Sequence, residues 1–237
     1  LELTGSTKDS SIVIAALIVA QIANLPPSGV VADRTSRKKM IVFADVLAMC
    51  AQITIAILFI SGYATVPTLA GLMLVNGIAT ALGTPATAGF IPQIVDAKDL
   101  QSANALLGIA RNSAVMMGAA IAGVLVATVG AGVTLAIDAV SFGISALLIV
   151  SLTPKQQAIV KSASLIEDLR LGWNEFISHT WLWTIVLQFT FIVAASEAVF
   201  GLIGPAVAKE FMGGSIDWGL IAASFGMGTL LGGLLAI

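Results

Sequence analysis

Seven apolar segments, each long enough to cross a membrane as a helix, constrain the fold of this chain more than any other feature. Each holds at most one ionisable residue, and a helix needs about 20 apolar residues to cross a bilayer core. Hydrophobic residues make up 58% of the chain and charged residues 10%, which leaves too little polar surface for a soluble domain. The sequence therefore predicts an all-α polytopic membrane protein. The segments are residues 11–32, 40–60, 66–91, 105–128, 132–152, 181–204 and 218–237.

The lysines and arginines indicate how these segments are oriented. Alternating topology places the polar segments 33–39, 92–111 and 153–180 on one side of the membrane. They hold nine of the eleven lysine and arginine residues, and cytoplasmic loops carry such an excess. We therefore predict a multi-pass protein of the cytoplasmic (inner) membrane, with residues 33–39, 92–104 and 153–180 in the cytoplasm.

Loop lengths suggest how the chain is divided. The outer loops at 61–65 and 129–131 are short, so their flanking helices should form hairpins. The longest polar stretch, 153–180, has apolar residues at helical spacing, which predicts an amphipathic helix on the membrane interface. A solvated linker helix packed on the bundle is the alternative. We expect an N-terminal helix bundle over 1–152, a cytoplasmic linker over 153–180 and the start of a C-terminal bundle over 181–237.

A cluster of five charges in residues 33–39 separates the first two apolar segments. Its spacing resembles the Gly-x-x-x-Asp-Arg-x-Gly-Arg-Arg/Lys loop of the major facilitator superfamily, with Ser36 where that family often has glycine. The matching residues are Gly29, Asp33, Arg34, Arg37 and Lys38.

Further segments are similar to the drug-exporter branch of that superfamily, which includes macrolide and siderophore exporters. The resemblance implies a major facilitator fold of which about seven helices, the second to the eighth of twelve, are present. The chain opens without methionine and ends inside an apolar run, so we expect an internal fragment whose N-terminal bundle lacks its first helix. One antiporter motif is incomplete, because residues 118–123 keep the small residues but not the proline. The resembling segments include 83–86, 91–95, 137–142, 168–172 and 218–219.

The resemblance also implies a function. We expect a secondary transporter, not an enzyme, that exports a drug-like or other amphipathic solute by alternating access and proton antiport. Its partners would be the lipid bilayer, the solute and protons, and it would be a monomer when full length, with no cofactor, metal or nucleic acid. A non-transporting scaffold or receptor on the same fold, and a facilitator of another solute class, are the alternatives.

The charged loop is expected to act as a conformational latch. In the resembled family, Asp33 would engage the positive end of a helix in the second half of the molecule. Arg37 would bridge to Asp96 and complete the contact. The alternative is that these basic residues only anchor topology. The predicted latch residues are Gly29, Asp33, Arg34, Arg37, Lys38 and Asp96.

Carboxyl groups inside the apolar segments are candidates for proton coupling. A charge at mid-bilayer costs about 2.5–3.5 kcal/mol on insertion scales, so each needs a partner or a function. We rank Glu197 first, then Asp138 and Asp45, with a structural hydrogen-bonded carboxylate as the alternative for each. Polar residues expected to face a central substrate cavity are Gln52, Asn76, Gln188 and Ser196.

Overall fold

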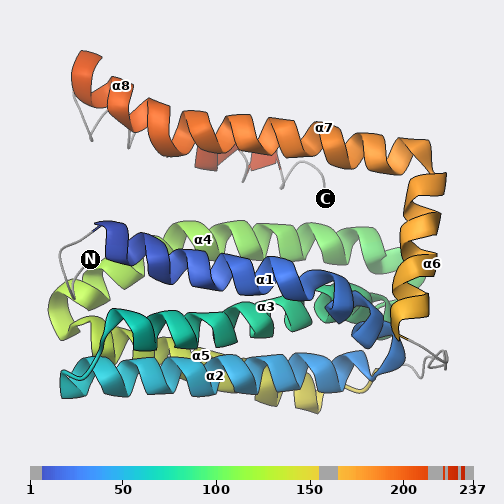
Figure 1. Cartoon of the computed structure of the whole chain (residues 1–237), viewed down its shortest axis with the longest axis horizontal. Coiled ribbons are helices and arrows are strands. Elements are labelled where there is room, and N and C mark those ends of the chain that lie inside the picture. Colours follow the sequence, from blue (N-terminus) through green and yellow to red (C-terminus); the bar gives the residue numbers. More distant parts are fainter. Residues whose placement is uncertain (1–6, 155–164, 213–220, 222–223, 229–230, 233–237) are drawn as a thin grey trace. The chain divides into compact units, whose positions relative to one another are not determined.

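A computed structural model describes residues 7–154, 165–212, 221, 224–228 and 231–232, and the regular structure within these ranges is helical (Figure 1). The prediction of an all-α chain is confirmed. The first four predicted apolar segments each fall within one α-helix, and the fifth, 132–152, ends one residue beyond its helix. A 3-10 turn η1 (Ala97–Asp99) and a π-helical segment η2 (Ala198–Ile203) interrupt the α-helices. The α-helices are α1 (Thr7–Arg34), α2 (Arg37–Ser61), α3 (Val66–Ile94), α4 (Leu100–Val129), α5 (Ala131–Ser151), α6 (Leu165–Ser178), α7 (Thr180–Glu197) and α8 (Gly204–Phe211).

Two short turns link consecutive helices as the sequence predicts. Gly62 ends α2 with a φ of 76°, a left-handed conformation that glycine adopts without steric cost. Thr65 then starts α3 in a capping box with Thr68, in which each side chain accepts the other residue's backbone N–H. Gly130, with a φ of 82°, is the single residue between α4 and α5.

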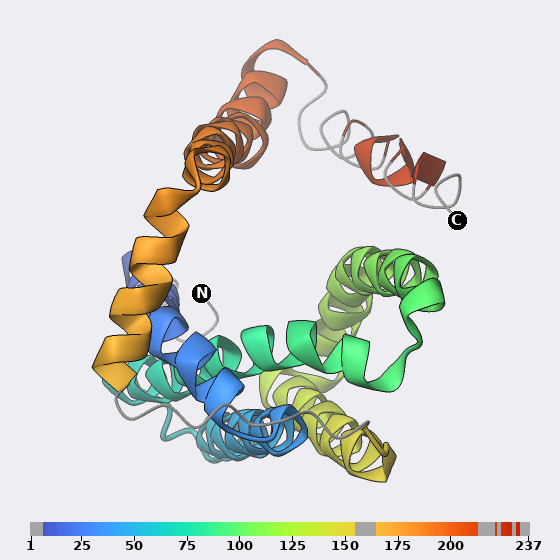
Figure 2. The same cartoon turned by 90° about the vertical axis from the view of Figure 1, so that its right-hand side faces the viewer.

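The chain divides into two compact units, residues 1–103 with 117–165 and residues 104–116 with 166–237. In the first unit α3 packs against α1 and α2, and α2 also packs against α5 (Figure 2). Gly77 of α3 allows the closest approach to α1, because a Cβ there would meet the carbonyl oxygen of Leu17. Small residues at helix contacts are characteristic of membrane bundles, where backbones approach closely.

The side chains that point away from these contacts are largely apolar. Phe43, Ile57 and Leu147 are each more than half exposed, an arrangement that suits lipid contact and not water. Within the described ranges, four helical segments are long and apolar enough to cross a membrane. They are Ser11–Arg34, Arg37–Ser61, Val66–Ile94 and Ala131–Ser151.

The second unit contains a sharp bend between an amphipathic helix and an apolar one. The segments Leu169–Ser178 and Thr180–Ser196 meet at 90° and form a further candidate for a broken span (Figure 1). The rings of Trp173 and Phe176 lie 5.8 Å apart on α6. Since α6 runs perpendicular to the apolar α7, it has the direction of a helix that lies along a membrane surface. That placement stays a prediction.

The apolar segment expected over 181–204 is not one uninterrupted α-helix. The α-helix ends at Glu197, and η2 follows before α8 begins. Pro205 has no N–H to donate to the carbonyl of Gly201, so α-helical hydrogen bonding is interrupted just before α8. The last expected span, 218–237, lies mostly outside the described residues, as do the matching residues 218–219.

Candidate functional site

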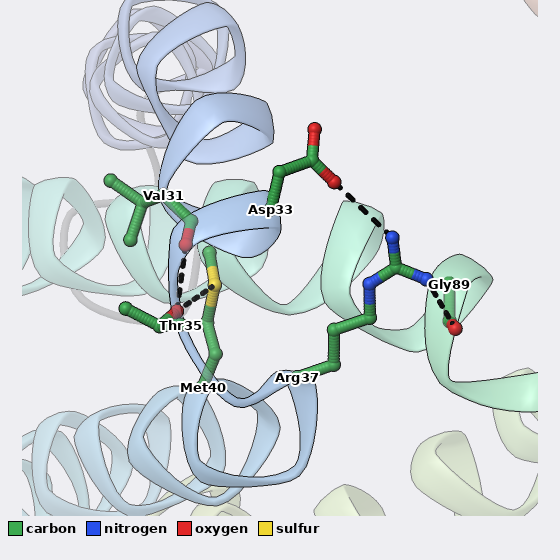
Figure 3. A network of polar contacts seen from close by, with 6 residues as sticks. All are labelled: Val31, Asp33, Thr35, Arg37, Met40 and Gly89. Atoms are coloured by element: carbon green, nitrogen blue, oxygen red, sulfur yellow. Dashed lines mark hydrogen bonds and ion pairs between the residues drawn. The ribbon is translucent and has the colours of Figure 1, made fainter. Parts of the chain in front are cut away.

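One arginine joins three helices at the basic end of the first unit. Arg37, the first residue of α2, places Nη2 3.2 Å from Oδ1 of Asp33, near the end of α1 (Figure 3). Its Nη1 donates to the carbonyl oxygen of Gly89 on α3 at 2.5 Å. The Arg37 side chain is 21% exposed and that of Asp33 69%. The guanidinium is therefore largely enclosed, while the carboxylate that it holds faces outward.

Two hydroxyl side chains shape the turn that carries this arginine. Thr35 donates to the carbonyl oxygen of Val31 at 2.7 Å and lies 3.9 Å from the sulfur of Met40 (Figure 3). Ser36 is the N-cap of α2 and accepts the backbone N–H of Lys39 at 3.5 Å. These contacts satisfy backbone groups where one helix ends and the next begins, and they fix the direction in which α2 leaves α1.

Glycine at position 89 is what lets the guanidinium reach the backbone of α3. A Cβ there would overlap the guanidinium of Arg37. A Cβ at Gly29, by contrast, would have no heavy atom within 4 Å in the described part of the chain. The role predicted for Gly29 in the latch stays a prediction.

Lys38 connects the start of α2 to the end of α5. Its Nζ donates to the carbonyl oxygens of Val150 and Leu152, both at 2.7 Å. The last carbonyls of a helix have no partner within the helix, and a cation also complements their partial negative charge. The first two residues of α2 thus contact α1, α3 and α5.

The other two predicted latch residues lie close to this junction in the sequence. Arg34 is the last residue of α1, and Asp96 is exposed at the N-cap position of η1. The observed partners of the Arg37 guanidinium are Asp33 and Gly89. A bridge from Arg37 to Asp96 stays a prediction.

Two polar contacts join α2 and α5 deeper within their apolar stretches. Ser145 donates its hydroxyl to Oδ2 of Asp45 at 2.7 Å. Gln52 donates its amide to Oδ2 of Asp138 at 2.5 Å. Polar groups in membrane spans typically pair across helices in this way. The structure thus brings together two residues that we had placed in separate roles, Gln52 as a substrate candidate and Asp138 as a coupling candidate.

These contacts form a regular series, which we call the α2–α5 polar ladder. Successive members lie seven residues apart on both helices, and seven residues are close to two helical turns. They therefore line up along one face of each helix, and the two helices run antiparallel. Lys38, Asp45 and Gln52 of α2 contact Leu152, which directly follows α5, and then Ser145 and Asp138 of α5, in that order.

The remaining candidate residues lie in different parts of the structure. Gln52 Oε1 and Asn76 Nδ2 are buried atoms without a hydrogen-bond partner among the described residues, so each can still accept or donate a bond. Gln188 and Ser196 are exposed on α7, which belongs to the second unit, and Glu197 is the last residue of α7. A substrate cavity shared by the two units stays a prediction.

Sequence reasoning missed four of the partners, which are the carbonyls of Gly89, Val150 and Leu152 and the hydroxyl of Ser145. Gly89 acts through its backbone carbonyl, which every residue type possesses, so no side-chain pattern points to it. Ser145 could have been found, since it lies seven residues after Asp138, just as Gln52 lies seven residues after Asp45. Polar residues that lie the same number of positions apart on two apolar helices indicate that these helices pack against each other.

Together, the apolar helices, the polar contacts between them and the basic junction at one end define a multi-pass helical membrane protein. Comparison with known families then identifies it. The family described as transmembrane secretion effector, within the major facilitator superfamily, matches residues 6–237. The chain belongs to this family of membrane transporters, and the predicted membership of the major facilitator superfamily is confirmed.

A curated relative supports the same assignment. The chain is 23% identical over 235 residues to an uncharacterized MFS-type transporter, YvqJ, from Bacillus subtilis strain 168. The alignment covers 96% of this chain and 56% of that transporter, so the chain spans about half the length of its relative. No solved structure matches the chain significantly.

Proposed function

We propose that the protein exports a drug-like or other amphipathic small solute across the cytoplasmic membrane by alternating access, driven by proton antiport. Membership of the transporter family supports transport, and the resemblance to drug exporters supports the solute class and direction. The observation that carries the proposal is the junction of Asp33, Arg37 and Gly89, which joins α1, α2 and α3 at the basic end. We propose that this end is cytoplasmic and that the full-length protein works as a monomer.

The junction has the properties that a reversible latch requires. Alternating access needs the helix ends on one side of the membrane to close in one state and separate in the other. A hydrogen bond to a charged group contributes about 1.5–3 kcal/mol, which changes a two-state equilibrium by roughly tenfold to a hundredfold. A contact of this strength between Asp33 and a helix of the other half would bias one state without making it permanent. The exposed carboxylate of Asp33 remains open to a helix of the other half.

Proton coupling requires a carboxyl group that changes charge during the cycle. Asp45 and Asp138 accept hydrogen bonds from a neutral hydroxyl and a neutral amide, so proton uptake would remove charge from the α2–α5 polar ladder. Glu197 lies where α7 meets the π-helical segment η2, and π-helical segments are frequent at functional sites. We propose Glu197 as the first candidate for the proton carrier, followed by Asp138 and Asp45.

The solute would contact polar side chains that lack a full set of partners. Gln52 and Asn76 each have a buried, unpartnered polar atom in the described structure. We also propose Gln188 and Ser196 of α7 as solute contacts. A few polar groups in a mostly apolar cavity suit an amphipathic solute.

Transport in proteoliposomes tests the proposal. The protein should export an amphipathic fluorescent solute faster when a pH gradient is imposed. Glu197→Gln should abolish the acceleration of export by the pH gradient but leave movement of the solute down its own concentration gradient in place. Asp138→Asn and Asp45→Asn test the other two candidate proton carriers in the same way. Glu167→Gln, on α6 outside the apolar spans, is the matched control and should behave like the wild type.

The outcomes separate the proposal from its alternatives. Gradient-driven export that survives in all three carboxyl variants would exclude them as proton carriers. If solute flux through the wild-type protein does not depend on the pH gradient, the protein would be a facilitator. An absence of flux for any solute would favour a scaffold or receptor.

A further inference from the structure

A groove opens at the surface at the start of α2. It lies between α2 and α5, has a volume of about 370 Å³ and is lined by Lys38, Lys39, Val42, Phe43, Val46 and Val150. This volume is within the usual range of small-ligand sites, about 300–1,000 Å³. The geometry points to an anionic phospholipid as the occupant, with its headgroup at the two lysines and an acyl chain along the valines and Phe43.

The charges at the groove favour an anionic headgroup. Lys39 is exposed, and Lys38 uses two of its three ammonium protons for the carbonyls of Val150 and Leu152, which leaves one donor. None of the lining residues is acidic. The N-terminus of α2 adds partial positive charge at the same end of the groove.

The apolar part of the groove suits an acyl chain. Phe43, Val46 and Val150 are 59%, 40% and 53% exposed, although they lie in stretches apolar enough to span a membrane. Val46 is seven residues beyond Lys39, which is about 10 Å along a helix. The lining thus changes from cationic to apolar over the distance that separates a lipid phosphate from the upper part of its chains. Basic pockets between helices on the cytoplasmic side are suited to such lipids.

This inference requires a membrane-embedded chain and is independent of what the transporter carries. A failure of proton-coupled export would leave it intact, and its own failure would not affect the transport proposal. The two experiments therefore give separate answers.

Lipid binding to the purified protein in detergent provides the test, with native mass spectrometry as the readout. Phosphatidylglycerol should bind more tightly than phosphatidylcholine with the same acyl chains. Lys39→Gln should weaken phosphatidylglycerol binding by about fivefold, from about 1 kcal/mol for one basic residue near a lipid surface, and leave phosphatidylcholine binding unchanged. Val46→Trp should fill the groove and weaken both lipids.

The controls distinguish a site from general surface charge. Lys98→Gln removes an exposed lysine from η1, away from the groove, and should leave binding unchanged. An equal loss in Lys98→Gln and Lys39→Gln would overturn the inference, as would displacement of the lipid by glycerol phosphate at equal concentration. No preference for phosphatidylglycerol in the wild type would also overturn it. Because Lys39 is exposed, its substitution tests the site even if Val46→Trp fails to fold.

Discussion

The contacts of Arg37 depend on the shape of its guanidinium group. Its planar guanidinium reaches a carboxylate on α1 with one nitrogen and a backbone carbonyl on α3 with the other. A lysine has one compact ammonium group and cannot spread its donors in a fixed fork. The contact with Gly89 also needs a residue without a side chain.

Gly89→Ala should therefore disturb the junction. The added Cβ would overlap the guanidinium, and Arg37 would have to leave one or both acceptors. We expect a net loss of about 0.5–2 kcal/mol in the free energy of unfolding, and slower transport. The lost hydrogen bond of the charged guanidinium costs about 1.5–3 kcal/mol, and alanine returns about 1 kcal/mol through its higher helix propensity. Thermal unfolding in detergent and solute export in proteoliposomes measure the two effects.

Gly71→Ala is the matched control on the same helix. A Cβ at Gly71 has no heavy atom within 4 Å among the described residues, and alanine favours a helix over glycine by about 1 kcal/mol. This variant should be as stable as the wild type or slightly more so. Equal stability of Gly89→Ala and Gly71→Ala would contradict the role that we give to Gly89.

The sequence predicted the charged members of this junction but not its second acceptor, the carbonyl of Gly89. Asp33 and Arg37 were identifiable because charges are rare in this chain and their spacing is that of a known loop. The carbonyl of Gly89 gives no such signal. Its contact depends on how closely α3 approaches α2, which only the packed structure determines.

At the level of helices, the α2–α5 polar ladder specifies which two neighbours pair and in what register. A double-mutant cycle with Asp45→Ala and Ser145→Ala should reveal this coupling, because each change removes one partner of the hydrogen bond. We expect an interaction energy of about 0.6 kcal/mol, the average for polar contacts between membrane helices, and at most about 1.7 kcal/mol. Unfolding in mixed micelles is the measurement.

Ser141→Ala provides the control for this cycle. The hydroxyl of Ser141 donates to the carbonyl of Asp138 within its own helix, at 2.7 Å, so it should show no coupling to Asp45. Coupling of equal size for Ser141 and Ser145 would contradict a specific contact between Asp45 and Ser145.

Helix boundaries were more predictable than helix partners. The short loops predicted at 61–65 and 129–131 from the limits of the apolar segments are observed, with Gly62, Thr65 and Gly130 at the helix ends. The apolar helices, by contrast, are hydrophobic on nearly every side, so periodicity does not show which face meets which neighbour. The π-helical segment before α8 was also missed, because its cause involves the missing N–H of Pro205 rather than hydropathy.

For the molecule as a whole, the uneven distribution of lysine and arginine predicts its orientation, and this can be tested directly. Tyr63 lies in the turn between α2 and α3, and Lys98 lies in η1 beyond the other end of α3. Because α3 has 29 residues and is about 43 Å long, these positions should be on opposite sides of a hydrocarbon core of about 30 Å.

In a Cys50→Ala background, a membrane-impermeant maleimide should label Tyr63→Cys in intact cells. It should label Lys98→Cys only after the membrane is permeabilised. The reverse pattern would place the junction at Arg37 on the outer side, where it could not close a cytoplasmic gate.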